Sequence, residues 1–267
     1  MSKIVEKYCE FPSFMRRPMW RIWHNYIIKF DDDVSVNFMN YGYQSLNGHV
    51  PIELDEEDEP NRYGIQLYHY VVSKIKTEGK DIIEIGSGRG GEASFISHYH
   101  KPKTYVAVDI SEKIIKFCNT HYDVQGLSFV QGKAEDLPLE SNSFDVAVNV
   151  ESSRCYTSKQ AFFNEVKRVL RPGGKLMLAD MIEPHEMAGY KKAIDECSLK
   201  IEEETDITKN IVKAQDHDTE RRKTLIDKKV PGFLRTNFYQ FAGTKGSERY
   251  EAFNNGRFRY MSFVITS

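Results

Sequence analysis

A glycine-rich turn placed between an apolar run and a helical pattern is the feature that most constrains the fold of this chain. Asp81–Ile85 is a short apolar run, and the residues from Glu84 to Gly91 read Glu-Ile-Gly-Ser-Gly-Arg-Gly-Gly. Glycines let the chain turn sharply from a strand into a helix, and they let a ligand approach the backbone closely. The turn therefore predicts a buried strand followed by a helix, with either a ligand site or a tight empty loop between them.

Strand-like and helix-like patterns alternate on both sides of this turn. We predict helices at 63–76, 92–100, 111–120, 160–170 and 206–229, and strands at 81–85, 104–108, 128–131, 144–150, 175–179, 199–205 and 257–266. Ser111 is a typical N-cap residue for the third of these helices. Strands that alternate with helices favour a parallel sheet that is covered on both faces. The predicted fold is α/β: a Rossmann-like, doubly wound, seven-stranded and mostly parallel sheet.

The first sixty residues differ in character from the rest. They are rich in Phe, Trp and Tyr, and residues 20–30 have apolar side chains near helical spacing. We interpret residues 1–60 as an aromatic-rich helical cap or lid within the same domain, and residues 61–267 as the main domain. The acidic run Glu53–Glu59 is interpreted as a solvated loop.

Composition excludes several classes of protein. The 267 residues carry a net charge of −2, so no global attraction to nucleic acid is expected. No run of about 18 apolar residues is present, so no membrane-spanning helix is expected. The four cysteines form no CxxC pair, and no cluster of histidines and acids has metal-ligand spacing. We expect free thiols in a reducing cytoplasm. The sequence leaves open whether the chain forms an oligomer.

An acidic residue follows the glycine turn at an informative distance. Asp109 ends the next predicted strand, within Val-Asp-Ile-Ser, and a carboxylate there can accept hydrogen bonds from both ribose hydroxyls. The same spacing occurs in proteins that bind NAD. The glycines and Asp109 therefore indicate an adenosine-containing ligand without saying which one.

Three later segments narrow this choice. Ala-Glu-Asp-Leu-Pro follows the third strand at Ala134, Phe-Asp-Val begins the fourth strand at Phe144, and Leu-Arg-Pro-Gly-Gly precedes the fifth strand at Leu170. With Glu-Ile-Gly-Ser-Gly and Val-Asp-Ile-Ser, the set resembles the motifs of the class I S-adenosylmethionine (SAM)-dependent methyltransferases, in their order, across about residues 40 to 182. The resemblance implies SAM as the cofactor and S-adenosylhomocysteine as its product.

The resemblance also implies roles for individual residues in cofactor binding. Glu84 would receive the amino group of SAM, Gly86, Ser87 and Gly88 would pass under its methionine and ribose, and Asp109 would hold the ribose. Ile110 would pack on the adenine, and Ala134 and Glu135 would read the adenine edge. Asn149 would line the cofactor at the end of the fourth strand. Tyr43 has two interpretations, as an aromatic cover near the sulfonium or as a core side chain.

Glu151 is the candidate catalytic residue. It lies just beyond the fourth strand, where doubly wound folds bind ligands, and its carboxylate would take a proton from the acceptor or orient the acceptor. His185 is a second candidate base, although a surface histidine is the favoured interpretation. Cys155 is interpreted as a buried thiol rather than as a nucleophile.

A narrower resemblance extends over most of the chain. Asn40–Tyr43, Asn149–Tyr156 and the tail from Phe241 to Gly256 are similar to segments of the phthiotriol and related polyketide-lipid O-methyltransferases, and more distantly to sterol and sarcosine/dimethylglycine methyltransferases. Arg154 stands where that family is expected to carry histidine.

These resemblances lead to one favoured function and two alternatives. The favoured function is methyl transfer to a hydroxyl of a hydrophobic small molecule such as a polyketide, lipid or other secondary metabolite. The first alternative is N-methylation of a small amine. The second is a non-catalytic SAM-binding scaffold protein. Nucleic-acid methylation is disfavoured, because the Asn149 segment lacks the Asn/Asp-Pro-Pro-Tyr pattern of amino-directed DNA enzymes.

Overall fold

The computed structural model describes residues 36–47 and 52–267, and its centre is one seven-stranded sheet. The strands are β1 (Asp81–Ile85), β2 (Thr104–Asp109), β3 (Leu127–Gln131), β4 (Phe144–Val150), β5 (Leu170–Ile182), β6 (Lys200–Asp206) and β7 (Arg259–Thr266). Their order across the sheet is β3-β2-β1-β4-β5-β7-β6. Strands β1 to β5 pair in parallel, and β7 is antiparallel to both of its neighbours. The predicted doubly wound, mostly parallel sheet is therefore confirmed.

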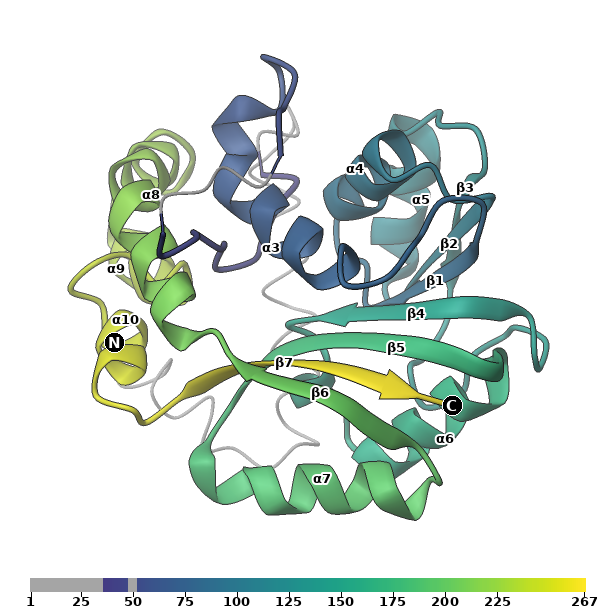
Figure 1. Cartoon of the computed structure of the whole chain (residues 1–267). Helices are drawn as coiled ribbons and strands as arrows, with labels where there is room; N and C mark the ends of the chain where they lie inside the picture. Colours follow the sequence, from purple (N-terminus) through teal and green to yellow (C-terminus); the bar gives the residue numbers. More distant parts are fainter. Residues whose placement is uncertain (1–35, 48–51) are drawn as a thin grey trace.

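Helices cover both faces of this sheet (Figure 1). They are α3 (Arg62–Val72), α4 (Gly91–Tyr99), α5 (Glu112–His121), α6 (Lys159–Val169), α7 (Met187–Glu196), α8 (Thr208–Lys229), α9 (Gly232–Phe241) and α10 (Glu248–Asn254), with the 3-10 turns η1 (Glu59–Asn61), η2 (Ser153–Cys155) and η3 (Pro184–Glu186). Helices α3, α4 and α5 lie on one face, and α6 and α7 lie on the other. None of the helices in residues 36–47 and 52–267 is long and apolar enough to cross a bilayer.

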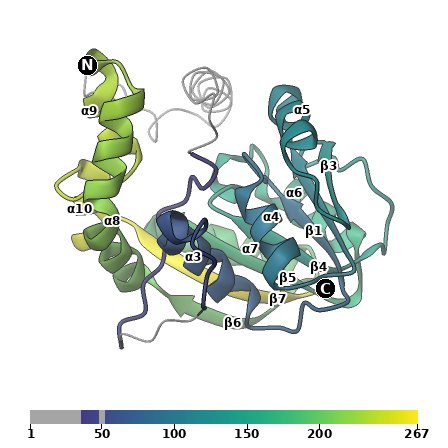
Figure 2. The ribbon, with the colours of Figure 1, turned by 90° about the horizontal axis from the view of Figure 1, so that it is seen from above.

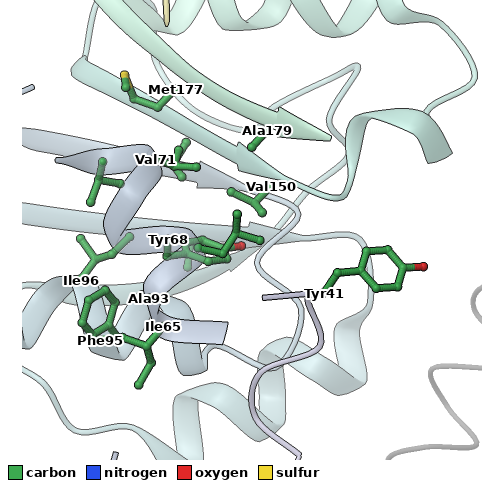
Figure 3. Packing of buried hydrophobic residues seen from close by; sticks show 14 of the residues in the cluster. Tyr41, Ile65, Tyr68, Val71, Ala93, Phe95, Ile96, Val150, Met177 and Ala179 are labelled. Carbon is green, nitrogen blue, oxygen red and sulfur yellow. The ribbon is translucent and has the colours of Figure 1, made fainter. Parts of the chain in front are cut away.

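The alternation of strand side chains explains why both faces are covered. Ile82 in β1 packs into a core shared with α3, α4 and α5, whereas the next residue, Ile83, packs into a second core shared with α6 and α7. Successive side chains of a strand point to opposite faces, so a strand buried on both sides must be apolar almost throughout. Figure 3 shows the first core, with Tyr68 among the side chains of α3 and α4 and Tyr41 at its margin.

The order of the strands creates a crevice at one edge of the sheet. Strand β1 pairs with β2 on one side and with β4 on the other, so the chain reverses its direction of winding between β1 and β4. In doubly wound folds, ligands bind beyond the carboxyl ends of the strands at such a switch point. Ile85 and Val150 end these two strands, and the glycine turn and Glu151 follow them directly.

A column of helices stands beside this crevice. Helices α8, α9 and α10 are inserted between β6 and β7, and Figure 2 shows them on one side of α3, with α4 and α5 on the other. Ile226 of α8 and Val230, which follows α8, pack on Phe238 of α9, with Met39 from the N-terminal segment against them. Residues 36–47 therefore join the insertion to the sheet.

Several elements differ from the sequence-based expectation. Helices α7, α9 and α10 were not predicted, and a few buried side chains anchor them to distant elements, such as Tyr190 and Ile194 of α7 in the second core. Strand β5 begins at Leu170, directly after α6, and bulges before Lys175 pairs with Val146. Pro172 and Gly173 therefore lie in that bulge, after α6 has ended at Val169. The predicted helix at 20–30 lies outside the described residues.

Candidate functional site

A pocket lies at the carboxyl ends of β1, β2 and β4, and we call it the strand-end pocket. Its lining comes from the glycine turn, the first turn of α4, the residues after β4, and the N-terminal segment. The lining residues are Met39, Asn40, Tyr41, Tyr68, Gly86, Ser87, Gly88, Arg89, Glu92, Asp109, Val150, Glu151, Ser152, Arg154, Cys155 and Phe241. Gly86, Ser87, Gly88, Asp109 and Glu151 of the predicted site are brought together here, although 65 residues separate the first from the last.

The glycine turn passes close beneath the chain that follows β4. Gly86 and Gly88 have φ of 86° and 51°, in the left-handed region that favours glycine. A Cβ atom at Gly86 would collide with Oγ of Ser152. The backbone N–H groups of Gly86 and Ser87 both donate to the carbonyl of Val108, at 2.7 and 3.0 Å, so the turn is pinned to β2.

Asp109 is held in position by the backbone of two loops. Its Oδ2 accepts the Gly88 N–H at 3.2 Å and its Oδ1 accepts the Ser111 N–H at 2.9 Å. Burial raises the pKa of Asp109 to about 6, and these backbone hydrogen bonds oppose that rise. Each carboxylate oxygen retains further acceptor capacity, which is what two ribose hydroxyls require.

Buried polar atoms beside the turn lack partners among the described residues. Asn149 is fully buried, and its Nδ2 donates to the Ile85 carbonyl at 2.7 Å and to the Tyr156 hydroxyl at 2.9 Å. Its Oδ1 and the Oγ of Ser87 have no hydrogen-bond partner. Ser87 lines the strand-end pocket, so its unpaired hydroxyl fits a polar ligand such as SAM there, because unpaired buried polar atoms are costly; the predicted site residue Asn149 does not line the pocket.

Glu84 lies one layer below the strand-end pocket. Its side chain is fully buried and accepts hydrogen bonds from the hydroxyls of Tyr68 at 2.9 Å and Tyr105 at 3.0 Å. Burial raises its pKa to about 7, and the two tyrosine hydrogen bonds oppose that rise. Tyr68 lines the pocket and Glu84 does not. Glu84 therefore does not contact the strand-end pocket directly. It can act on the amino group of SAM only through Tyr68 or after its own side chain moves.

Glu151 lies at the rim where β4 ends. Its φ of 51° is unusual for a residue other than glycine, and Glu151 lines the strand-end pocket. Its Oε1 accepts the Tyr41 N–H at 2.8 Å and the Tyr260 hydroxyl at 2.9 Å. Burial raises the pKa of Glu151 to about 7, and the nearby Arg154 opposes that rise. A carboxyl with this pKa changes its charge near neutral pH.

The remaining predicted cofactor residues lie outside the pocket lining. Tyr43 stacks on Tyr70, with ring centroids 4.4 Å apart, so its core interpretation is the one that these contacts support. Ala134 is buried in the second core. Glu135 accepts hydrogen bonds from the backbone and hydroxyl of Thr157, which ties the loop after β3 to the start of α6. Ile110 follows Asp109 directly at the end of β2.

The two other reactive side chains have different surroundings. His185 is exposed and lies 3.6 Å from Glu183. It is not among the residues lining the strand-end pocket, which leaves the surface interpretation. Cys155 does line that pocket and is half-buried.

Several pocket residues were missed by the sequence-based site, and three of them carry polar groups that contact one another or the rest of the site. Glu92, in the first turn of α4, is buried, and its pKa rises to about 8 because of burial and the nearby Glu84 carboxylate. Asn40 donates to Glu92 at 3.3 Å and to the Gly64 carbonyl at 3.2 Å. Tyr41, not Tyr43, is the tyrosine of the Asn40–Tyr43 segment that enters the pocket. A carboxylate after the glycine turn was the available signal for Glu92.

A second, apolar pocket adjoins the first, and Met39, Asn40, Tyr41 and Phe241 line both. We call it the apolar pocket. Its other lining residues come from the N-terminal segment, η1, α8, α9 and the residue that follows each of these two helices: Val36, Phe38, Asn61, Arg221, Arg222, Leu225, Ile226, Lys229, Val230, Phe238 and Ala242. Arg222 holds this wall together, because it donates to the carbonyls of Ala242 at 2.9 Å and Asn40 at 3.1 Å.

Comparison with known proteins identifies the family. A methyltransferase domain family matches residues 83–178. The chain is 31% identical over 248 residues, 93% of its length and 92% of the relative's, to a phthiotriol/phenolphthiotriol dimycocerosates methyltransferase of Mycobacterium tuberculosis. It is 34% identical over 234 residues to a fatty-acid O-methyltransferase of Mycolicibacterium smegmatis, covering 88% and 84% of the two chains. This chain belongs to the SAM-dependent methyltransferases.

Solved structures show the same fold for this methyltransferase. A sarcosine dimethylglycine methyltransferase from Galdieria sulphuraria aligns over 91% of this chain and 97% of its own, with a TM-score of 0.69 at 15% identity. A geranyl diphosphate methyltransferase, solved in complex with SAM, aligns over 87% and 99%, with a TM-score of 0.63 at 15% identity. The matched family region contains the glycine turn, Asp109 and Glu151, whereas most of the apolar pocket lies outside residues 83–178.

Proposed function

We propose that this methyltransferase transfers a methyl group from SAM to an oxygen atom of a hydrophobic, lipid-like acceptor. The observation that carries the proposal is the continuity of the two pockets, since Met39, Tyr41 and Phe241 line both. An acceptor with a long apolar body in the apolar pocket would present its head group toward Glu151. The relatives named for phthiotriol dimycocerosates and for fatty acids support a lipid as the acceptor.

The pocket residues have distinct tasks in this proposal. SAM supplies a methyl group that is already activated on a sulfonium sulfur, so the protein mainly aligns donor and acceptor and excludes water. Asp109 and the turn at Gly86–Gly88 bind the nucleoside side. Glu151 faces the acceptor, and its pKa of about 7 suits it either to take a hydroxyl proton or to orient the acceptor by a hydrogen bond.

An acceptor screen tests this proposal. The full chain is incubated with SAM and, in separate reactions, with an alcohol, a carboxylic acid and an amine that share one long alkyl chain. Release of S-adenosylhomocysteine and the mass of the methylated product are measured. Methyl ether or methyl ester formation supports the proposal. Methylation of the amine alone contradicts it and favours the N-methyltransferase alternative, and SAM binding without any transfer favours the scaffold alternative.

Further properties of the sequence stay predictions. We expect no nucleic-acid partner, because the net charge is −2, and we expect a cytoplasmic enzyme, because the described cysteines Cys118 and Cys197 are free thiols. We propose that residues 1–60 form a cap. Residues 36–47 belong to this proposed cap, and Met39, Asn40 and Tyr41 of this segment line both pockets.

A further inference from the structure

Arg154 is a charged residue of the strand-end pocket that the proposed function leaves without a task. It lies in η2, three residues after Glu151, at the position where the related lipid O-methyltransferases are expected to carry histidine. Its side chain is 18% exposed, and its Nη1 atom is buried without a hydrogen-bond partner among the described residues. A buried guanidinium nitrogen without a partner costs free energy unless a ligand satisfies it.

The nearest acid does not satisfy this guanidinium. Asp180 is buried, and its carboxylate accepts hydrogen bonds from the Ser153 hydroxyl at 2.6 Å, the Met181 N–H at 2.8 Å and the Arg154 N–H at 3.0 Å. The Nε atom of Arg154 lies 3.9 Å from Asp180, beyond hydrogen-bond distance. Asp180 therefore positions the backbone of η2 and makes no bidentate pair with the Arg154 side chain.

Arg222, at the wall of the apolar pocket, provides a contrast. Its guanidinium donates to the Asp218 carboxylate at 2.7 Å and to the carbonyls of Ala242 and Asn40. Those contacts engage its donors in holding α8, α9 and the N-terminal segment together. Arg154 has no comparable set, so it is the better placed of the two to bind an anionic ligand group.

The geometry assigns Arg154 to a carboxylate on the acceptor, so we infer that the acceptor is a long-chain carboxylic acid and the product its methyl ester. A guanidinium fork matches a carboxylate in two parallel hydrogen bonds, whereas it repels an ammonium group and leaves an alcohol without a matching charge. This inference rests on the proposed function, because it names the oxygen that receives the methyl group.

The transfer balances without a base. A lone pair of the carboxylate oxygen forms the bond to the methyl carbon, the bond between methyl and sulfur breaks, and its electron pair stays on sulfur. The positive sulfonium and the negative carboxylate disappear together, giving a neutral ester and S-adenosylhomocysteine. Since an ionised acid carries no proton, Glu151 removes no proton from it. Glu151 orients this acceptor only in its protonated form, whose O–H donates to the acceptor carboxylate.

The test compares two acceptors that differ only in the head group. Methyl transfer by the full chain is measured with a long-chain fatty acid and with the alcohol of the same chain length, for the wild type, Arg154→Lys and Arg154→Gln. We expect the wild type to prefer the acid, and Arg154→Gln to lower kcat/KM for the acid by about 10- to 100-fold, mainly through KM, with a smaller loss for Arg154→Lys. Transfer to the alcohol and the Kd for SAM, measured by calorimetry, stay within about 3-fold.

Arg171→Gln is the matched control. Arg171 pairs with Asp81 and Asp145 near the amino ends of β1 and β4, at the opposite edge of the sheet from the pocket, so its loss removes an ion-paired arginine without touching the site. A wild type that methylates the alcohol and not the acid overturns the inference and leaves the proposed function standing. Equal losses for acid, alcohol and SAM binding in Arg154→Gln also overturn it, because Arg154 would then serve the carboxylate of SAM or the stability of η2. Transfer to neither lipid counts against both proposals.

Discussion

The strand-end pocket and the apolar pocket adjoin each other but are built in different ways. The strand-end pocket rests on backbone groups and short side chains that follow directly after strands, such as Gly86, Gly88 and Asp109. The apolar pocket is assembled from side chains of α8, α9 and residues 36–41, which pack together only in the folded chain. A site of the first kind can be recognised from a short sequence motif, whereas a site of the second kind cannot. Variants that separate cofactor binding from acceptor binding test this difference.

The largest expected effect follows from closing the glycine turn. In Gly86→Ala, the new Cβ would collide with Oγ of Ser152, and the backbone has a φ of 86° that side chains disfavour. We expect SAM affinity measured by calorimetry to fall by about 100-fold or more, about 3 kcal/mol. Gly189→Ala is the control, because a Cβ there meets no atom within 4 Å and α7 tolerates alanine. Normal SAM binding by Gly86→Ala would show that the turn does not carry the cofactor.

The next effect concerns the chemistry at the junction of the two pockets. Glu151→Gln keeps an oxygen that can accept from Tyr41 and Tyr260 but removes the ionisable carboxyl. We expect kcat with a long-chain alcohol to fall by about 100-fold, and kcat with the matching acid by less than about 10-fold, because only the alcohol needs a base. Stopped-time assays with both acceptors measure the two values. Equal losses would assign Glu151 to orientation or packing alone.

A smaller effect is expected from filling the apolar pocket. Leu225 is half-buried and lines that pocket, so the larger side chain of Leu225→Trp should fill the space in which we propose that an acyl chain binds. We expect the KM for the lipid acceptor to rise by about 10-fold while the Kd for SAM stays unchanged. Leu46→Trp adds the same side chain at an exposed position and serves as control. A change in SAM affinity without a change in acceptor KM would contradict the division of labour between the pockets.

The smallest effect is a change in how stability depends on pH. Burial and the Glu84 charge raise the pKa of Glu92 to about 8 from an ordinary value of 4.5, so between these pH values the folded chain keeps a proton that the unfolded chain releases. Stability therefore falls as pH rises through this window. In Glu92→Gln the fall should be shallower, by at most about 1.4 kcal/mol per pH unit, in urea unfolding at several pH values. Glu57 is exposed, so Glu57→Gln should keep the wild-type dependence of unfolding free energy on pH. An unchanged dependence in Glu92→Gln would show that the Glu92 carboxyl does not cause the loss of stability.

Most of the sheet and the position of the cofactor turn could be predicted from the sequence. The apolar runs at Asp81–Ile85 and Phe144–Val150 match β1 and β4, because strands buried on both faces must be apolar throughout. The helices α7, α9 and α10 could not be predicted, since they are short and gain their stability from contacts with distant elements. Tyr43 and Glu84 illustrate the same limit for the predicted site, because the stacking of Tyr43 on Tyr70 and the hydrogen bond from Tyr68 to the buried Glu84 are tertiary contacts that keep both residues out of the pocket lining.

The sequence by itself determined the doubly wound fold, the SAM-dependent family and the glycine turn at which we propose that the cofactor binds, because these depend on residues that are neighbours along the chain and act through the backbone. Only the tertiary structure decided which side chains line the two pockets. It brought Tyr41 and Arg154 beside Glu151, and it placed α8 and α9 over the N-terminal segment to form an apolar pocket. Packing between segments that are far apart in the chain makes that choice, and no local pattern records it.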